Sequence, residues 1–324
     1  MKRILGIGNA LVDVLTKVDN EQILSELHLP KGSMQLLSTE AYAEVTRRMQ
    51  ALPTKLTTGG SACNTLLALS HLDAPTGMIG KIGDDENGRF FASYFAQRGI
   101  STRLLHDSRP TGVASTFITP DGQRTFGTYL GAAARLTADE LQQAWFEGYD
   151  YFYIEGYLVQ NHDLVLRAIE LAHAAGCEVC LDLASYNIVE ADLDFFRALM
   201  PSIDIVFANE QEAQALTGLE ARAALDALAA TCHIAVVKIG KHGVWACHGI
   251  EVAHCAARDV PLVVDTTAAG DYFAAGFMHA LAAGEPLATC IARGSLLAGH
   301  IIEVVGTELP DATWQQLRLQ CGLA

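Results

Sequence analysis

One acidic residue beside a turn of small residues is the first candidate for chemistry in this sequence. Asp271 follows the small residues of 266–270 and precedes an alanine-rich helical pattern. Small residues before a helix let several backbone N–H groups point at one spot, where the helix dipole also favours negative charge. A carboxylate there would repel a bound anion, unless it removes a proton from the group that attacks the anion. The combination therefore predicts phosphoryl transfer.

A second turn of this kind lies near the start of the chain. Gly59 and Gly60 would let the backbone approach a ligand closely, and Ser61 is a natural helix N-cap. Asn64 falls on the first turn of the helix that follows. On its own, the pattern is more simply explained as an ordinary glycine loop before a helix.

Asp13 is a third candidate, because it interrupts an apolar strand near the N-terminus. It is either an exposed edge residue or a ligand contact, and the residues alone do not decide between these. The preceding Gly6-x-Gly8 lacks the third glycine of a dinucleotide-binding fingerprint, and no helix follows it at once.

The elements that must position these residues alternate regularly from residue 149 onward. We expect strands at 150–155, 177–183, 203–208, 233–239 and 261–264, with helices between them. Nearly continuous apolar strands separated by helices predict an α/β fold, in which helices cover both faces of a parallel sheet. Ligands bind such sheets beyond the carboxyl ends of the strands. Three loops would therefore meet at one edge, namely 209–212, 238–243 and the turn before Asp271.

The segment after residue 101 breaks this alternation. Short strands flank the turn at 120–123, which has hairpin chemistry. We expect a β lid formed from about 11–37 and 101–131 within a single domain, 1–324. The exposed strand edges of the lid could pair with a second copy, giving a homodimer, or stay bare.

Composition excludes several classes of protein. A formal charge of −15 argues against binding to nucleic acid, which depends on Lys and Arg. No apolar run reaches the ~18 residues that span a bilayer, and the N-terminus does not resemble a signal peptide. The eight cysteines lie mostly in apolar stretches, and Cys177-x-x-Cys180 falls within a strand-like run. We therefore expect buried free thiols and a cytoplasmic location.

Several segments together resemble the ribokinase-like (PfkB-type) carbohydrate and nucleoside kinases, in the family's order and over essentially the whole chain. The matching segments are Asp265-Thr266-Thr267-Ala268-Ala269-Gly270-Asp271, Gly59-Gly60-Ser61-Ala62-x-Asn64 with Gly80 and Gly83-Asp84-x-x-x-Gly88, and Asn209-x-x-Glu212. The resemblance implies a three-layer α/β/α ribokinase-like fold with a mainly parallel central sheet and a small β lid. It also implies an ATP-dependent, Mg²⁺-assisted kinase that phosphorylates a hydroxymethyl group of a sugar or nucleoside.

Residue roles follow from the resemblance, position by position. Asp271 matches the catalytic base, and the backbone of Ala268, Ala269 and Gly270 matches the anion hole. On the ATP side the matching residues are Asn209, Lys238, Gly240 and Gly243, with Glu212 holding the hydrated magnesium ion. On the acceptor side they are Asp13, Gly59, Gly60 and Asn64, and Glu155 is a further candidate. Asp265 and Thr267 match positions that hold a monovalent cation such as K⁺ in some members, and dependence on that cation is not assumed.

Many members of the family have glycine at the position of Ala268. Alanine is compatible with the turn only if its φ is negative.

The sequence does not decide whether the acceptor is a sugar or a nucleoside. Segments 8–13 and 124–132 look most like the branch that contains adenosine kinase and its bacterial sugar-kinase relatives. Asp13 would bind vicinal hydroxyls, which both a ribose and a hexose offer. Arg124 on the lid could contact an anionic acceptor or the ATP phosphates, or it could face solvent. A non-catalytic nucleoside- or sugar-binding relative is the alternative of another class; it predicts loss of Asp271, Glu212 or the glycine turn, and none is lost.

Overall fold

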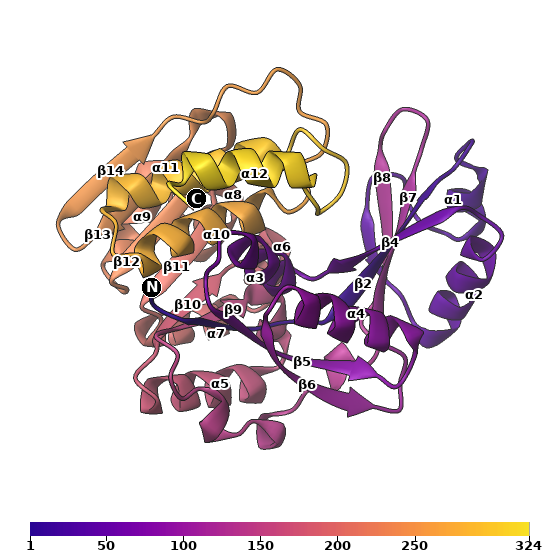
Figure 1. The fold of residues 1–324 in the computed structure, drawn as a ribbon, viewed down its shortest axis with the longest axis horizontal. Helices are drawn as coiled ribbons and strands as arrows, with labels where there is room; N and C mark the ends of the chain where they lie inside the picture. Colours follow the sequence, from indigo (N-terminus) through magenta and orange to yellow (C-terminus); the bar gives the residue numbers. More distant parts are fainter. Residues whose placement is uncertain (324) are drawn as a thin grey trace.

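The computed structural model describes residues 1–323, and two β-sheets organise it (Figure 1). The larger sheet has the strand order β14-β13-β12-β11-β10-β9-β1-β5-β6. Its strands are β1 (Ile4–Ile7), β5 (Thr76–Gly83), β6 (Ser101–Asp107), β9 (Tyr151–Glu155), β10 (Glu178–Asp182), β11 (Ile205–Asn209), β12 (Ile234–Lys238), β13 (Val244–His248) and β14 (Glu251–Cys255). Neighbours are parallel except in the β12–β13 and β13–β14 pairs, so the sheet is mainly parallel, as predicted.

Helices cover both faces of this sheet. One layer contains α3 (Ser61–His71), α4 (Glu86–Gln97), α10 (Ala269–Ala282), α11 (Leu287–Ile301) and α12 (Asp311–Gln320). The other contains α5 (His162–Ala174), α6 (Tyr186–Ala191), α7 (Leu193–Leu199), α8 (Glu210–Thr217) and α9 (Ala221–Ala229). Short 3₁₀ helices lie at Ala133–Arg135, Ala138–Glu140, Gln143–Trp145, Gly156–Gln160, Met200–Ser202 and Gly240–His242.

The strands serve both helix layers because successive side chains point to opposite faces of a sheet. Along β1, Ile4 packs into the core on the α3 side, whereas Leu5 and Ile7 pack into the core on the α5 side. The predicted three-layer α/β/α fold with a β lid is confirmed.

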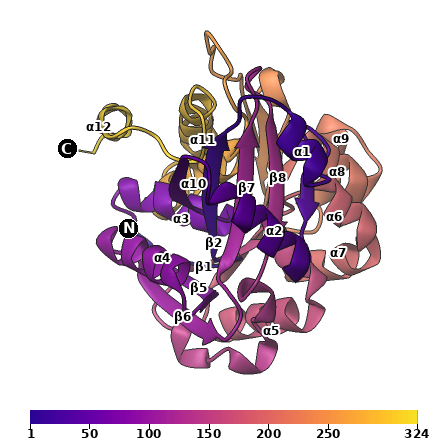
Figure 2. The same cartoon turned by 90° about the vertical axis from the view of Figure 1, so that its right-hand side faces the viewer.

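The smaller sheet is the lid, at the right of Figure 1. Its strand order is β3 (Met34–Leu36), β8 (Arg124–Tyr129), β7 (Gly112–Ile118), β2 (Leu11–Lys17) and β4 (Thr54–Gly59). The helices α1 (Gln22–Glu26) and α2 (Thr39–Met49) lie over its outer face, in front of the strands in Figure 2. Val45 and Met49 of α2 bury Phe117 of β7 there, which leaves the other face of the lid toward the main sheet.

The expected lid segment 101–131 is too long at its start. Residues 101–107 form β6, which pairs in parallel with β5 of the main sheet. Leu104 and Leu105 of β6 pack against opposite cores of that sheet, which holds the strand there. The lid gains 54–59 instead, because β4 pairs with β2.

The strand expected at 261–264 is absent. This segment has no strand hydrogen bonding, and Leu262, Val263 and Val264 are exposed. Val263 lines the cavity beside the turn at 266–270, so its apolar side chain serves that cavity rather than a strand. The β13–β14 hairpin forms the end of the sheet in its place.

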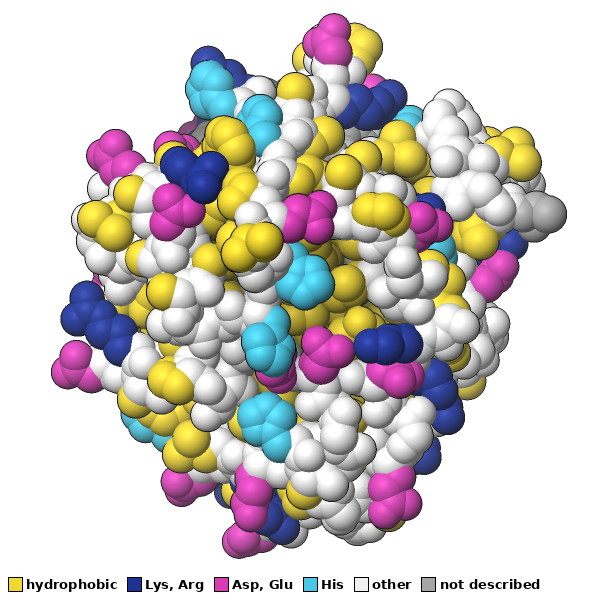
Figure 3. Space-filling model, turned by 90° about the vertical axis from the view of Figure 1, so that its left-hand side faces the viewer, with side chains coloured by type: hydrophobic (Ala, Val, Ile, Leu, Met, Phe, Trp, Pro, Cys, Tyr) yellow, Lys and Arg dark blue, Asp and Glu magenta, His cyan; other side chains and the backbone are white. Residues whose placement is uncertain are grey.

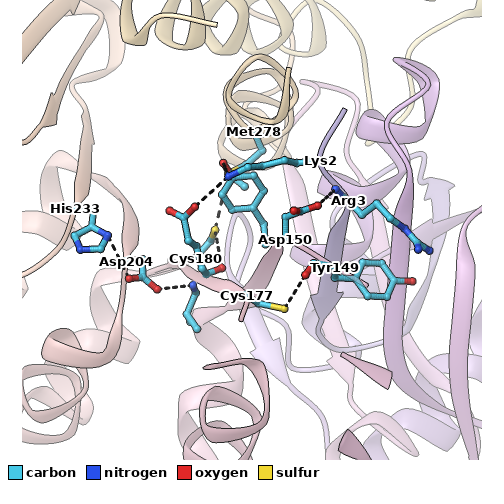
Figure 4. A network of polar contacts seen from close by, with 12 residues as sticks. Lys2, Arg3, Tyr149, Asp150, Cys177, Cys180, Asp204, His233 and Met278 are labelled. Carbon is cyan, nitrogen blue, oxygen red and sulfur yellow. Dashed lines mark hydrogen bonds and ion pairs between the residues drawn. The ribbon is translucent and has the colours of Figure 1, made fainter. Parts of the chain in front are cut away.

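Polar side chains at the amino ends of the strands satisfy one another and the backbone (Figure 4). Lys2 Nζ lies 3.3 Å from Glu178 Oε1, at the start of β10. Asp204 accepts a hydrogen bond of 2.7 Å from the backbone N–H of Val179 and lies 3.4 Å from His233 Nδ1. Figure 3 shows this side, opposite the lid, where several histidines lie among acidic and basic side chains.

The cysteines follow the expectation of free thiols. Within residues 1–323 all eight are unpaired, and Cys177 Sγ donates to the carbonyl of Tyr149, as Figure 4 shows. Over the same residues, none of the helices combines the length and the apolar character needed to cross a membrane.

Candidate active site

Four neighbouring parallel strands end on a polar residue at the carboxyl edge of the main sheet. β9 ends at Glu155, β10 at Asp182, β11 at Asn209 and β12 at Lys238. Glu155 is level with Asp182 in the sheet, and Asn209 is level with Lys238. Helix α10, which carries Asp271 in its first turn, begins at the same edge.

Asp271 is held by side chains of α3. Ser61 Oγ donates to Asp271 Oδ1 at 2.7 Å, and Asn64 Nδ2 donates to Oδ2 at 2.8 Å. Gly60 is the N-cap of α3, so Ser61 is not the expected helix cap but a partner of Asp271. Asn64, expected to contact the acceptor, likewise orients this carboxylate.

The surroundings tune the acidity of Asp271. Burial raises its pKa to about 7, although the hydrogen bonds from Ser61 and Asn64 oppose the change. The negative charge of Asp182 adds to the rise, and the positive charge of Lys238 lowers the pKa. A carboxyl group with a pKa near 7 is matched to accepting a proton at neutral pH.

The turn before Asp271 is strained at Ala268. This residue has φ 61°, so the condition of a negative φ, under which an alanine would be unstrained here, is not met. The left-handed conformation costs an alanine about 1–2 kcal/mol. Strain of this kind persists where the surroundings fix the backbone, which is common at functional sites.

A cavity of about 960 Å³ extends from this turn. The residues predicted on the ATP side line it together, and they are Asn209, Glu212, Lys238, Gly240, Gly243, Thr267 and Ala268 to Asp271. Val260, Val263, Ala298 and Ile302 form an apolar part of its wall. The structure thus gathers residues from five separate segments into one space of ligand size.

Asn209 and Glu212 form a reciprocal pair at the start of α8. Glu212 Oε2 accepts from the backbone N–H of Asn209 at 2.7 Å, and Asn209 Oδ1 accepts from that of Glu212 at 2.9 Å. Burial raises the pKa of Glu212 to about 7, although the positive charge of Lys238 lowers it.

The carboxylates of this cavity fit Mg²⁺. Mg²⁺ prefers oxygen ligands and binds through one or two carboxylates together with substrate phosphates. Glu212 supplies such a carboxylate, and no group of three or more candidate ligands occurs within residues 1–323. A magnesium ion here would therefore depend on the phosphates and on water for its other ligands.

Asp182 and Tyr157 belong to the site but were not predicted. Asp182 Oδ2 lies 3.3 Å from Lys238 Nζ, and both side chains are largely buried. Tyr157 and Ser61 line the 960 Å³ cavity and also a second cavity of about 710 Å³. The only sequence signal for Asp182 was its place at the end of a predicted strand.

The second cavity lies between the main sheet and the lid. Asn9, Gly60 and Glu155 supply polar groups, and Leu11, Leu36, Leu130, Leu136, Leu158 and Ile188 form apolar walls. Because Ser61 lines both cavities and donates to Asp271, the two spaces meet beside the candidate base.

Glu155 is already bonded within the protein. It accepts from the backbone and side-chain N–H groups of Asn9 at 2.8 and 2.6 Å, and from the backbone N–H of Ala62 at 3.0 Å. A Cβ atom at Gly8 would lie 2.5 Å from Glu155 Oε2. Glu155 therefore joins β9 to α3 and to the loop that follows β1, at the wall of the cavity.

Asp13 packs closely against the turn formed by Gly59 and Gly60. A Cβ at Gly59 would lie 2.1 Å from Asp13 Oδ1, and one at Gly60, where φ is 100°, would lie 2.2 Å from the carbonyl of Asn9. Asp13 is not an exposed edge residue, because β2 lies between β7 and β4. Burial raises the pKa of Asp13 to about 7, although Arg124 lowers it.

Arg124 does not face solvent. Its Nη1 lies 2.6 Å from Asp265 Oδ2, with side-chain exposures of 9% and 6%. Asp265 also accepts from the N–H and hydroxyl of Thr267 and from the N–H of Gly306. A guanidinium therefore occupies the Asp265 carboxylate, and the monovalent-cation site expected at Asp265 and Thr267 stays a prediction.

A turn of small residues beside a buried carboxylate, at the carboxyl edge of a mainly parallel sheet and under a β lid, is the arrangement of the ribokinase-like kinases. Residues 36–314 match the pfkB family of carbohydrate kinases. The chain therefore belongs to the pfkB family.

Known relatives include both nucleoside and sugar kinases. A probable sugar kinase from Rhizobium etli CFN 42 has a TM-score of 0.88 at 31% identity and covers 100% of this chain and 99% of its own. Adenosine kinase from Sinorhizobium meliloti has a TM-score of 0.87 at 32% identity, covering 99% of each chain. Adenosine kinase from Saccharomyces cerevisiae is 28% identical over 330 residues, which are 94% of this chain and 96% of that protein. Family membership implies ATP-dependent phosphoryl transfer to a sugar or a nucleoside.

Proposed function

We propose that this protein transfers the γ-phosphoryl group of ATP to a primary hydroxyl group of a nucleoside, with Asp271 as the general base. The observation that carries the proposal is the position of Asp271, where the two cavities meet. One cavity leads to the anion-binding turn, and the other has the apolar walls that a nucleobase would occupy.

The reaction needs little covalent chemistry from the protein. Asp271 accepts the proton of the acceptor hydroxyl as the hydroxyl oxygen forms a bond to the γ-phosphorus. The bond between the γ-phosphorus and the oxygen that bridges it to the β-phosphorus breaks, and ADP leaves. Ser61 and Asn64 keep the Asp271 carboxylate oriented. Backbone N–H groups of the 268–271 turn would stabilise charge on the transferred group, each contributing about 3–4 kcal/mol.

Magnesium, when bound, would neutralise phosphate charge on the ATP side. Glu212 is the residue placed to hold it, directly or through water. The lid would exclude water from the reacting groups, since water could otherwise take the phosphoryl group.

A nucleoside fits the second cavity better than a bare sugar does. Leu11, Leu36, Leu130 and Ile188 offer apolar surface that a hexose, with a hydroxyl on most carbons, would leave poorly used. Gly60 lines this cavity, and Asp13 lies behind it against Gly59 without lining the cavity, so these groups would reach the ribose hydroxyls only when the acceptor is bound. A sugar remains the second candidate, because Asp13 would bind vicinal hydroxyls of a hexose equally well.

An ADP-release assay distinguishes these acceptors. It would compare adenosine, inosine, guanosine, ribose, fructose and phosphorylated hexoses at matched concentrations. We expect the highest kcat/KM with a purine nucleoside. A higher value with fructose or a phosphorylated hexose would make the protein a sugar kinase, and activity with none would support a non-catalytic binding protein.

We also propose that the protein is located in the cytoplasm. Eight free thiols suit the reducing cytoplasm.

The lid edges β3 and β4 expose Leu36 and Leu56, so we propose a homodimer that pairs lid edges. A molar mass near 34.7 kDa by light scattering would show a monomer instead.

A further inference from the structure

An ion pair at the carboxyl edge spans a strand. Lys238 ends β12 and Asp182 ends β10, and β11 lies between them in the sheet. Lys238 Nζ nevertheless reaches within 3.3 Å of Asp182 Oδ2. The lysine side chain therefore extends across the end of β11, over the floor of the ATP-side cavity.

The ammonium group also lies against the anion-binding turn. A Cβ atom at Gly270 would lie 3.2 Å from Lys238 Nζ, and no other atom beyond the adjoining residues and the backbone of α10 lies within 4 Å of that point. Gly270 thus leaves the ammonium group room beside the turn where phosphoryl charge would gather. A lysine ammonium in this position can act as a point charge on a phosphate.

The charges around Lys238 are mostly negative. Burial tends to lower the pKa of Lys238, but the carboxylates of Asp182 and Glu212 outweigh burial and raise it. Asp271 acts in the same direction. Lys238 therefore stays charged at neutral pH, as one cation among three carboxylates.

Asp182 is fixed independently of the lysine. Its Oδ1 accepts the backbone N–H of Ala184 at 2.9 Å, and Ala184 has φ 63°, a left-handed conformation that is strained for alanine. The chain thus holds the carboxylate in one place at a cost in backbone energy. A buried ion pair adds little net stability, so stability alone does not explain the arrangement.

We propose that Lys238 is a catalytic residue whose ammonium group contacts the γ-phosphoryl oxygens of ATP, and that Asp182 is a positioning residue that holds it beside the 268–271 turn. This rests on the proposed kinase function, and it goes further by assigning the cation that neutralises the transferred group. In the reaction the ammonium group exchanges no proton; it stabilises charge on the oxygens as the phosphoryl group moves.

The test measures binding of ATP and of ADP, with magnesium and without acceptor, by calorimetry. In Lys238→Met we expect ATP affinity to fall about tenfold or more, and ADP affinity to stay within twofold, because only ATP has the γ-phosphate. Lys238→Arg keeps the charge and should retain most of the ATP preference. Equal losses for ATP and ADP, or no loss, would overturn the proposal.

Turnover then tests the role of Asp182. We expect kcat to fall about 10²–10³-fold in Lys238→Met and less in Asp182→Asn, at unchanged KM for the acceptor. The double variant should be no slower than Lys238→Met alone, because Asp182 acts through the lysine. Additive losses would show that Asp182 acts separately.

Lys2→Met is the matched control, since it removes a lysine from an ion pair at the other end of β10. It should change neither nucleotide affinity nor kcat. If the wild-type protein phosphorylates no acceptor but Lys238→Met still loses its preference for ATP over ADP, the kinase proposal fails while the γ-phosphate contact stands. If the wild type is active and Lys238→Met matches it, the contact alone fails.

Discussion

The two ends of β10 carry ion pairs of equal length and very different surroundings. At the amino end, Lys2 and Glu178 lie 3.3 Å apart with side-chain exposures of 47% and 39%. At the carboxyl end, Lys238 and Asp182 also lie 3.3 Å apart, with exposures of 16% and 6%. An exposed pair is worth little and costs little, whereas a buried one must be held in place by its surroundings. The buried pair at the carboxyl end of β10 therefore costs the folded protein free energy that the exposed pair at the amino end does not.

The same contrast holds for the edges of the whole sheet. At the amino edge, Asp204 is bonded to the backbone of β10 and lies beside His233, as Figure 4 shows. At the carboxyl edge, burial raises the pKa of both Asp271 and Glu212 to about 7. Hydrogen bonds and positive charges do not fully offset the loss of water around these carboxylates. Such carboxylates are characteristic of sites that a substrate or metal completes. The comparison predicts that substitutions at one edge affect catalysis, and that those at the other do not.

The largest effect should follow from Asp271→Asn. This change keeps the shape of the side chain but removes the proton acceptor, so we expect kcat with the best acceptor to fall by 10²–10⁴-fold. Steady-state kinetics would measure it. Glu178→Gln at the amino edge is the control and should stay within twofold of wild type. A loss below tenfold in Asp271→Asn would mean that another group is the base.

A smaller loss should follow from Gly59→Ala. The added Cβ would lie 2.1 Å from Asp13 Oδ1, so the carboxylate must move by an ångström or more. We expect kcat/KM for the acceptor to fall about 10²-fold with ATP affinity unchanged. Gly249→Ala, in the β13–β14 turn, meets no atom beyond its chain neighbours within 4 Å; its φ of 59° strains the turn, but this turn is outside both cavities, so kcat/KM should be unchanged. An equal loss of ATP affinity in Gly59→Ala would argue against Asp13 as an acceptor contact.

The smallest effect concerns stability. Ala268→Gly should raise the free energy of unfolding by up to about 1 kcal/mol, because relief of left-handed strain exceeds the extra flexibility of glycine. Ala269→Gly, one residue on and inside α10, should lower it by up to about 1 kcal/mol. Urea unfolding would compare the two. A loss in both variants would show that Ala268 is not strained.

Much of the carboxyl edge could be predicted from sequence, because it depends on local patterns. Asp271 follows a small-residue turn before a helix, and Asn209 and Glu212 follow an apolar strand. The alternation of strands and helices then brings such loops to one edge. The prediction of a strand at 261–264 was wrong because its apolar residues are exposed, and one of them, Val263, lines a cavity.

Contacts between distant segments could not be predicted. Ser61 and Asp271 are 210 positions apart, and their hydrogen bond depends on how α3 packs against α10. The pair of Asp182 and Lys238 depends on the order β10-β11-β12, which periodicity does not reveal. Arg124 reaches Asp265 only because the lid folds over the main sheet. Such pairings follow from topology, so they require the structure.

The pH dependence of kcat/KM in wild type and in Ser61→Ala tests the role of Asp271 most directly. The base must be unprotonated, so kcat/KM should rise with pH and level off above the pKa of Asp271, which is about 7. The Ser61 hydroxyl lowers that pKa, so its removal should move the rise to higher pH. A flat profile between pH 5 and 8, or the same profile in both proteins, would contradict the assignment of Asp271 as the base.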